Sequence, residues 1–320
     1  MIRNVLRLFE PFIVLLLGTV LLASFLPPRG GWAGAFATLA DSGIVLLFFL
    51  HGAKLSRQAI VDGARNWRLH LSVLGVTFGL FPLLGLGVEA LPLPPAIAAG
   101  MLFLTLLPST VQSSIAFTAI ARGNVAAALC SASFSNLLGI VVTPALVALL
   151  MHGNGGISLA ALETIVLQLL APFLAGHLLR PLIGGVVARR KTLLLVVDRG
   201  SILLVVYSAF GAAVVEGLWR RMSAGDLGVI IGLCVALLTV VLLATWALGR
   251  AFRFARGERI VLQFCGSKKS LASGVPMAGV LFPAAQVGVV LLPLMLFHQI
   301  QLIACAVIAR RYAVDDQDLV

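Results

Sequence analysis

The sequence has little charge. Only 11% of its 320 residues are charged, and Asp and Glu together number 12. Soluble domains carry roughly 25% charged residues, so this chain lacks the side chains needed to cover a globular surface in water. Hydrophobic residues make up 60% of the chain, and the mean hydropathy is +1.09. We therefore expect lipid to be its solvent, with every backbone N–H and C=O in the bilayer paired inside the protein.

The sequence also lacks the motifs of an enzyme or a metal protein. Its four cysteines all lie within apolar runs and do not have the short spacing of metal or redox motifs. There is no G-x-S-x-G, no H-E-x-x-H and no P-loop. We predict no catalytic residues, no bound metal centre and no cofactor other than a coupling ion, either sodium or a proton.

Long apolar runs are what the chain has instead. A helix needs about 20 residues to span the hydrocarbon core, and runs rich in Leu, Ala, Gly and Val favour helices over alternating strands. We predict an all-α polytopic membrane protein. Its ten transmembrane helices are expected at about 10–27, 33–53, 69–91, 95–120, 124–151, 158–180, 199–219, 226–249, 257–283 and 286–310.

The basic residues predict the orientation. The net charge of +11 is spread over short clusters between the apolar runs, which is typical of cytoplasmic loops and not of a nucleic-acid-binding surface. With the N-terminus inside, eighteen Lys and Arg residues fall in inside segments and three in outside segments. We therefore place both termini in the cytoplasm and expect the bilayer, not nucleic acid, as a partner.

Two of the ten spans are interrupted at matching places. Ten spans divide into repeats over 1–152 and 153–320, and five spans per half invert the second half relative to the first. The fourth span of each half contains polar residues, at 108–114 and at 265–270. Paired broken helices at corresponding positions indicate a transport site near the bilayer midplane. The alternative for 108–114 is a Pro-kinked helix whose hydroxyls bond to their own backbone.

Lys268 and Lys269 lie inside the second interrupted span. A charged side chain near the bilayer centre is costly and usually functional. The alternative is that a long side chain reaches back to the interface. Both lysines lie about ten residues from either end of the span, too deep for this to be easy. We expect at least one of them at the transport site.

Other polar residues within the spans are candidates for the same site. Ser131 and Ser135 lie four residues apart on one face of the fifth span, although such hydroxyls also mediate close helix packing. His298 is a candidate proton relay or, equally, a packing residue. The remaining candidates are Thr110, Gln112, Ser113 and Ser114 in the first interruption, Asn124 near the face of Ser131, and Ser270 in the second interruption.

Three segments of the chain form a recognisable pattern, namely 108–114, A-R-G-N-V at 121–125 and Thr143-Pro144. This pattern resembles the bile acid:sodium symporter family, and the segment 264–277 is similar to the bacterial SBF-like branch of that family. The resemblance implies a panel domain from helices 1, 2, 6 and 7 and a core domain from helices 3–5 and 8–10. It also implies that helices 4 and 9 cross at their breaks beside the substrate, in a carrier of the inner cell membrane.

The resemblance also shows where this chain departs from sodium-coupled relatives. The carboxylate that they carry in the ninth helix falls at Gln263 here, and two lysines have appeared nearby. An ammonium group repels the hard cations that oxygen ligands hold. The other family ligand positions fall at Ser113-Ser114 in the fourth helix, Ala128 and Ala132 in the fifth, Thr77 in the third and Ser267 in the ninth.

These features together predict a secondary active transporter of a small organic solute, an organic anion, that works by alternating access. We expect a lysine ammonium to replace a bound sodium ion. Its expected hydrogen-bond partners are Thr110, Gln112, Ser113 and Ser114. The same lysine could instead load and release a proton. The alternatives are a sodium-coupled symporter of the bile acid type and a non-transporting membrane regulator with the same fold.

Overall fold

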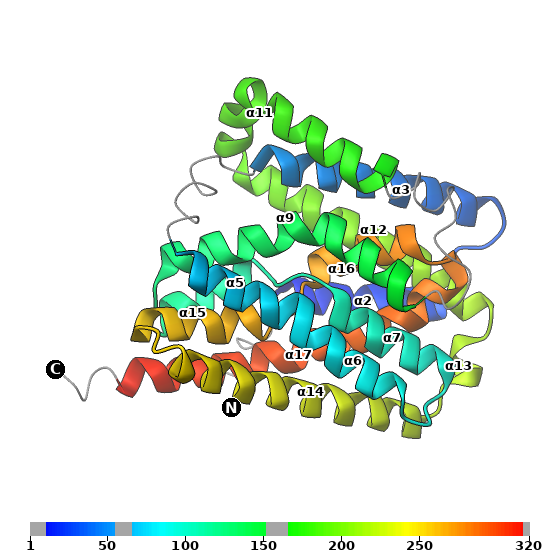
Figure 1. The fold of residues 1–320 in the computed structure, drawn as a ribbon. Coiled ribbons are helices and arrows are strands. Elements are labelled where there is room, and N and C mark those ends of the chain that lie inside the picture. Colours follow the sequence, from blue (N-terminus) through cyan, green and yellow to red (C-terminus); the bar gives the residue numbers. More distant parts are fainter. Residues whose placement is uncertain (1–10, 55–65, 152–165, 316–320) are drawn as a thin grey trace. The chain divides into compact units, whose positions relative to one another are not determined.

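The computed structural model describes residues 11–54, 66–151 and 166–315, and the regular structure of these residues is helical (Figure 1). Seven of the described helices are long and apolar enough to cross a membrane, which confirms a polytopic all-α membrane protein. They are Gly31–Lys54, Trp67–Glu89, Val125–Leu150, Val166–Val187, Thr192–Val215, Ala224–Ala251 and Ala284–Val314.

Seven such helices do not contradict the ten predicted spans, because the other three are built differently. The predicted spans 95–120 and 257–283 are each divided into two short helices, and the span 10–27 begins outside the described residues. Val14–Phe25 and Pro95–Leu106 are further apolar helices of fewer than 18 residues. The start of the predicted span 158–180 and both chain termini also lie outside the described residues. The cytoplasmic location of the termini stays a prediction.

The chain forms two compact units, and the first comprises Met1–Leu55, His152–Ala224 and Val275–Leu291. In this unit Gly52 and Gly176 allow two helices to approach backbone to backbone. A Cβ atom at Gly52 would overlap the carbonyl oxygen of Phe173, and one at Gly176 would overlap that of Phe49. Close approach through small residues is a common way for membrane helices to associate. The helices of this unit are α2 (Pro11–Phe25), α3 (Gly31–Lys54), η2 (Val166–Leu170), α11 (Ala171–Arg189), α12 (Lys191–Val215), α13 (Leu218–Arg221) and most of α16 (Leu271–Leu281).

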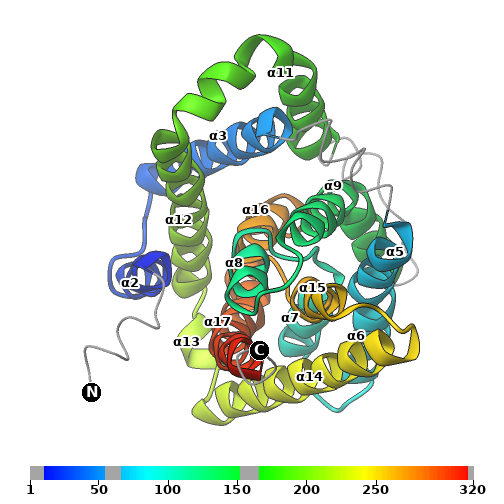
Figure 2. The same cartoon turned by 90° about the vertical axis from the view of Figure 1, so that its left-hand side faces the viewer.

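The second unit comprises Ser56–Met151, Gly225–Gly274 and Leu292–Val320. Its helices are α5 (Trp67–Gly75), η1 (Val76–Leu80), α6 (Phe81–Glu89), α7 (Pro95–Leu106), α8 (Gln112–Ile120), α9 (Val125–Leu150), α14 (Ala224–Ala251), α15 (Arg256–Gly266) and the later part of α17 (Ala284–Asp315). The first three run on as one rod, and Figure 2 shows α7 and α15 inside a ring formed by the longer helices of this unit. The repeat boundaries and the panel and core assignments stay predictions.

Both predicted interruptions are non-helical in the structure. Between α7 and α8 the backbone leaves the helix at Leu107, which is extended with φ −76° and ψ 156°. Pro108 explains this, because proline disfavours the helical conformation in the residue before it. Between α15 and α16 the chain is non-helical from Ser267 to Ser270. The preceding Gly266 is a weak helix former, as is usual near a helix end.

Candidate functional site

The two interrupted segments lie against each other in the second unit. The backbone N–H of Ser270 donates to the carbonyl of Pro108 at 2.9 Å. The hydroxyl of Ser109 donates to the carbonyl of Cys265 at 2.5 Å, in the last turn of α15. The last carbonyls of a helix have no partner within it, so each break supplies groups that the other needs. The site is therefore held together by its own non-helical backbone.

Lys269 points into a cradle of main-chain oxygens. Its Nζ donates to the carbonyls of Thr77 and Thr105, both at 2.8 Å, and of Leu107 at 2.6 Å. The side chain is fully buried, and Nζ lies 4.1 Å from the ring centroid of Phe81. A lysine ammonium has three N–H donors, so all three are used. The ring of Phe81 therefore lies close enough to the ammonium for a favourable cation–π interaction.

The carbonyl of Thr77 is available because η1 is a π-helical turn. The N–H of Phe81, which an α-helix would give to Thr77, bonds instead to the carbonyl of Val76. In the π-helical pattern the N–H of residue 82 would bond to the carbonyl of Thr77, but Pro82 has no N–H. Thr77 therefore has no helical donor, and Lys269 takes that place. Single π-helical turns are frequent at functional sites for this kind of reason.

The carbonyl of Thr105 is free for a related reason. In a continuous helix the N–H of Ser109 would bond to it, but that N–H donates to the hydroxyl of Ser135 at 2.9 Å. Thr105 and Leu107 lie at the C-terminal end of α7, where the helix dipole adds partial negative charge. Carbonyls at the C-terminal ends of half-helices coordinate sodium or protons in many transporters. The cradle is thus built like a site for a monovalent cation, and Lys269 supplies the cation.

Gln301 of α17 holds the backbone of Lys269 in place. Its Oε1 accepts the N–H of Lys269 at 2.9 Å, and its Nε2 donates to the carbonyl of Lys269 at 3.0 Å. The same Nε2 lies 2.9 Å from Nδ1 of His298. Because an amide nitrogen can only donate, this Nδ1 accepts and carries no proton. The candidate relay residue is therefore part of the support of Lys269.

Lys268 lies in a different setting. Its Nζ has one long hydrogen bond, to the hydroxyl of Ser113 at 3.3 Å, and faces the rings of Phe117 and Phe264 at 4.5 and 5.7 Å. The side chain is fully buried. Within the described residues no Asp or Glu lies within 4 Å of either lysine amine. Lys268 is thus a buried cation with hydrogen-bonding capacity to spare.

A further polar network joins the breaks to the fifth predicted span, and two of its members were missed by the sequence reasoning. Asn136 donates to the carbonyl of Ser109 at 2.7 Å and accepts from the hydroxyl of Ser273 at 2.7 Å. The hydroxyl of Ser273 lies 3.1 Å from that of Ser270. The sequence did offer a signal for Asn136, because an Asn within an apolar span is unusual. Ser273, like Gln301 on the backbone of Lys269, acquires its role only through contacts with residues distant in sequence.

The structure brings some of the predicted site residues together and places others elsewhere. Eight candidates lie at or beside the two breaks, namely Thr110, Ser113, Ser114, Ser135, Ser267, Lys268, Lys269 and Ser270. Of the four residues expected to bond a lysine amine, Ser113 does so, whereas Thr110 bonds to Ser113 and Ser114 to the carbonyl of Phe264. The fourth, Gln112, is exposed at the start of α8.

The remaining candidates have local partners. Asn124 is the N-cap of α9 and accepts from the N–H of Ala127, and Ser131 lies 2.7 Å from Nδ1 of His70. Gln263 donates to the carbonyl of Leu242 in α14, and its own carbonyl accepts from the hydroxyl of Ser267 at the second break. The family ligand positions Ala128 and Ala132 are buried without a polar side chain. These residues support the helices around the lysines more than they line a cavity.

Comparison with known proteins extends over almost the whole chain. Residues 10–314 match the model of the SBF-like CPA transporter family. The chain is 55% identical over 310 residues to the uncharacterised protein PA2026 of Pseudomonas aeruginosa, covering 95% of this chain and 93% of that protein. It is 51% identical over 311 residues to YfeH of Escherichia coli, a proposed symporter, covering 96% and 93%. It is 23% identical over 310 residues to sodium/bile acid cotransporter 7 of Xenopus tropicalis, covering 93% and 90%.

Proposed function

Because the chain belongs to the SBF-like CPA transporter family, and is thus a membrane transporter and not an enzyme, we propose that it carries a small organic anion by alternating access. In this proposal the ammonium of Lys269 takes the place of a bound sodium ion. The proposal includes ten transmembrane helices in two inverted repeats, a panel and a core domain, a location in the inner cell membrane and cytoplasmic termini. Support for the repeats comes from the two breaks, which interrupt matching predicted spans.

One observation carries the proposal, namely the three carbonyls around the amine of Lys269. Hard cations are held by oxygen ligands, and here the oxygens converge on a covalently attached charge. A sodium ion about 4 Å from that charge would be repelled by roughly 4 kcal/mol at an effective dielectric constant of about 20. The cradle is therefore permanently occupied, and transport does not require sodium.

The two lysines have different roles in this proposal. Lys269 has no free donor and fixes the crossing of the breaks. Lys268 has only its 3.3 Å bond to Ser113 among the described residues, so its other donors can form charge-assisted bonds to an anionic group of the substrate. The nearby N-terminus of α8, which begins at Gln112, adds partial positive charge that favours an anion.

The decisive experiment empties the cradle. In Lys269→Ala the three carbonyls remain, and we expect sodium or methylammonium to raise the thermal unfolding temperature of the purified variant relative to choline. Stabilisation by a ligand follows from mass action. Lys268→Ala is the matched control, because it leaves the cradle filled, and it should respond to these cations as the wild type does.

Three outcomes separate the proposal from its alternatives. Equal responses of Lys269→Ala and the wild type to sodium and choline would remove the idea that lysine stands in for a cation. Substrate uptake into proteoliposomes that strictly requires a sodium gradient would establish a sodium-coupled symporter. Ligand binding without flux across sealed vesicles would identify a non-transporting regulator.

A further inference from the structure

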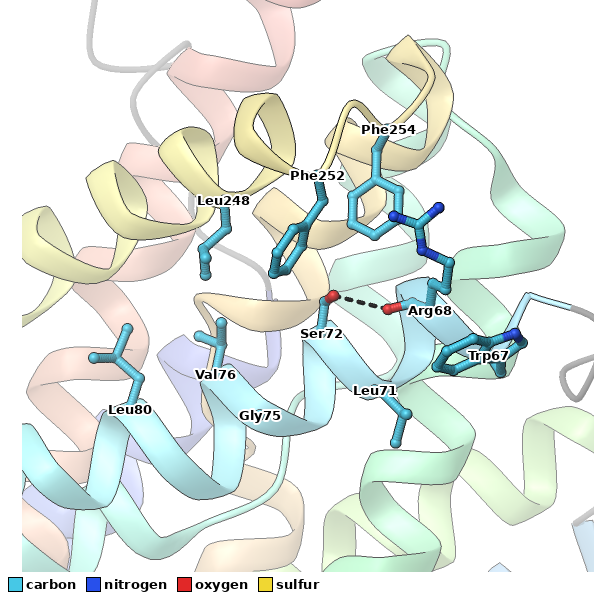
Figure 3. A pocket seen from close by; sticks show the side chains of 10 residues that line it. All are labelled: Trp67, Arg68, Leu71, Ser72, Gly75, Val76, Leu80, Leu248, Phe252 and Phe254. Atoms are coloured by element: carbon cyan, nitrogen blue, oxygen red, sulfur yellow. Dashed lines mark hydrogen bonds between the residues drawn. The ribbon is translucent and has the colours of Figure 1, made fainter.

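A groove of about 500 Å³ lies on the second unit, and neither Lys268 nor Lys269 lines it (Figure 3). One wall is the rod formed by α5 and η1, with Leu71, Val76 and Leu80, and the other is the end of α14, with Leu248 and the following Phe252. The size is that of a small-molecule site, but the walls are almost entirely apolar. The proposed transport of an organic anion makes no use of this groove.

The groove has one charged end. Arg68 and Trp67 lie there at the start of α5, and the guanidinium carbon of Arg68 is 5.9 Å from the ring centroid of Phe254 (Figure 3). Arg68 has no acidic partner among the described residues. The carboxylate of Glu258 is engaged by the side chain of Asn66 at 2.6 Å and the N–H of Ala255 at 3.1 Å. Trp and Arg are typical of the level of the lipid headgroups.

The length and access of the groove match a lipid chain. From Arg68 to Leu80 the rod rises by roughly 18 Å at about 1.5 Å per residue, close to one leaflet of a hydrocarbon core about 30 Å thick. Leu71 and Phe252 on its rim are 56% and 45% exposed, so a chain can enter sideways from the bilayer. A soluble anion would gain little from these apolar walls.

We propose that this groove binds one anionic phospholipid, with an acyl chain along α5 and η1 and the phosphate on Arg68. Two features assign this occupant. Arg68 at one end complements a negatively charged phosphate, and the rest of the groove is apolar and about one leaflet long. The lipid contacts Val76 and Leu80, which bound the same π-helical turn that gives the carbonyl of Thr77 to Lys269. Lipid occupancy therefore supports the turn on which the cation cradle depends.

Two glycines of the rod provide a matched test. A Cβ atom at either Gly75 or Gly79 would meet nothing within 4 Å, but only Gly75 lines the groove. Gly75→Leu fills the groove, and Gly79→Leu places the same side chain one turn later outside it. The thermal unfolding temperature is measured in detergent at increasing mole fractions of phosphatidylglycerol or of phosphatidylcholine with the same acyl chains.

We expect phosphatidylglycerol to stabilise the wild type and Gly79→Leu at lower mole fractions than phosphatidylcholine, and Gly75→Leu to lose this response. Arg68→Gln should raise the half-saturating mole fraction of phosphatidylglycerol about fivefold, the usual effect of one basic residue at an anionic surface, and Arg68→Lys should restore most of it. The proposal is wrong if both lipids act alike on the wild type, or if Gly75→Leu and Gly79→Leu respond equally. Stabilisation by glycerol 3-phosphate alone would also overturn it, since that would indicate a site for free anions.

Discussion

Gln301 bonds to the backbone of Lys269 on both sides, accepting its N–H at 2.9 Å and donating to its carbonyl at 3.0 Å. The two residues are far apart in the sequence and both are fully buried. This pair of bonds satisfies the backbone N–H and carbonyl of a non-helical residue inside the membrane, where no water is available to do so. The direction of the Lys269 side chain follows from this fixed backbone.

Removing the Gln301 amide should therefore be costly. Gln301→Leu leaves a buried N–H and a buried C=O without a partner, and each such group costs about 1–3 kcal/mol. We expect the free energy of unfolding in detergent to fall by roughly 2–4 kcal/mol in total. Gln299→Leu, on the same helix, is the control. The side-chain atoms of Gln299 are buried and form no hydrogen bond with a described residue, so its loss should be neutral or stabilising. Equal losses in the two variants would contradict this role for Gln301.

The two lysines should differ in stability. Lys269→Met leaves the carbonyls of Thr77, Thr105 and Leu107 without their donor, and we expect a loss on the order of 3 kcal/mol or more. Lys268→Met removes one 3.3 Å bond and a cation–π contact with Phe117, worth about 1 kcal/mol, and relieves the burial of a charge. Chemical unfolding of both variants in the same detergent measures the difference. If Lys268→Met is the less stable, the assignment of the two lysines has to be exchanged.

Much of the fold could be predicted from sequence, because membrane spans have a simple composition. The breaks were predictable too, since Pro108 disfavours a helical conformation before it and polar residues interrupt an otherwise apolar span. The sequence could not tell Lys268 from Lys269, because they are adjacent and chemically identical. What separates them is the direction of a non-helical backbone, which depends on Gln301, a residue 32 positions away from Lys269.

The details of the site were less predictable than its place. Asn124 was expected to bind the substrate or ion, but its side chain caps α9, a role that Asn performs at many helix starts. Ser131 and Ser135 share a face, yet one lies against His70 and the other accepts the N–H of Ser109. The π-helical turn that frees the carbonyl of Thr77 has no clear sequence pattern apart from Pro82. Such shifts in hydrogen-bond register are decided by tertiary partners.

Close packing in the first unit gives an independent prediction. Gly176→Ala puts a methyl group on the carbonyl of Phe49, so α3 and α11 must separate and we expect a loss of about 1–3 kcal/mol, as for other overpacked sites. Gly185→Ala, on the same helix, is the control, because a Cβ atom there meets nothing within 4 Å. That substitution should stabilise the protein by up to about 1 kcal/mol through helix propensity. Thermal unfolding of both variants measures the contrast, and a neutral Gly176→Ala would contradict the backbone contact.

The proposed anion site predicts a charge requirement at Lys268. In a thermal-shift screen of organic anions without sodium, an anion that stabilises the wild type should lose most of that effect in Lys268→Gln, because a charge-assisted bond becomes a neutral one. Lys268→Arg keeps the charge and should retain more of the effect. Ser113→Ala is the control for indirect disturbance, since it removes the 3.3 Å partner of the amine but not the charge, and the anion should still bind. If Lys268→Gln binds the anion as tightly as the wild type, the substrate lies elsewhere and Lys268 serves only the packing against Phe117 and Phe264.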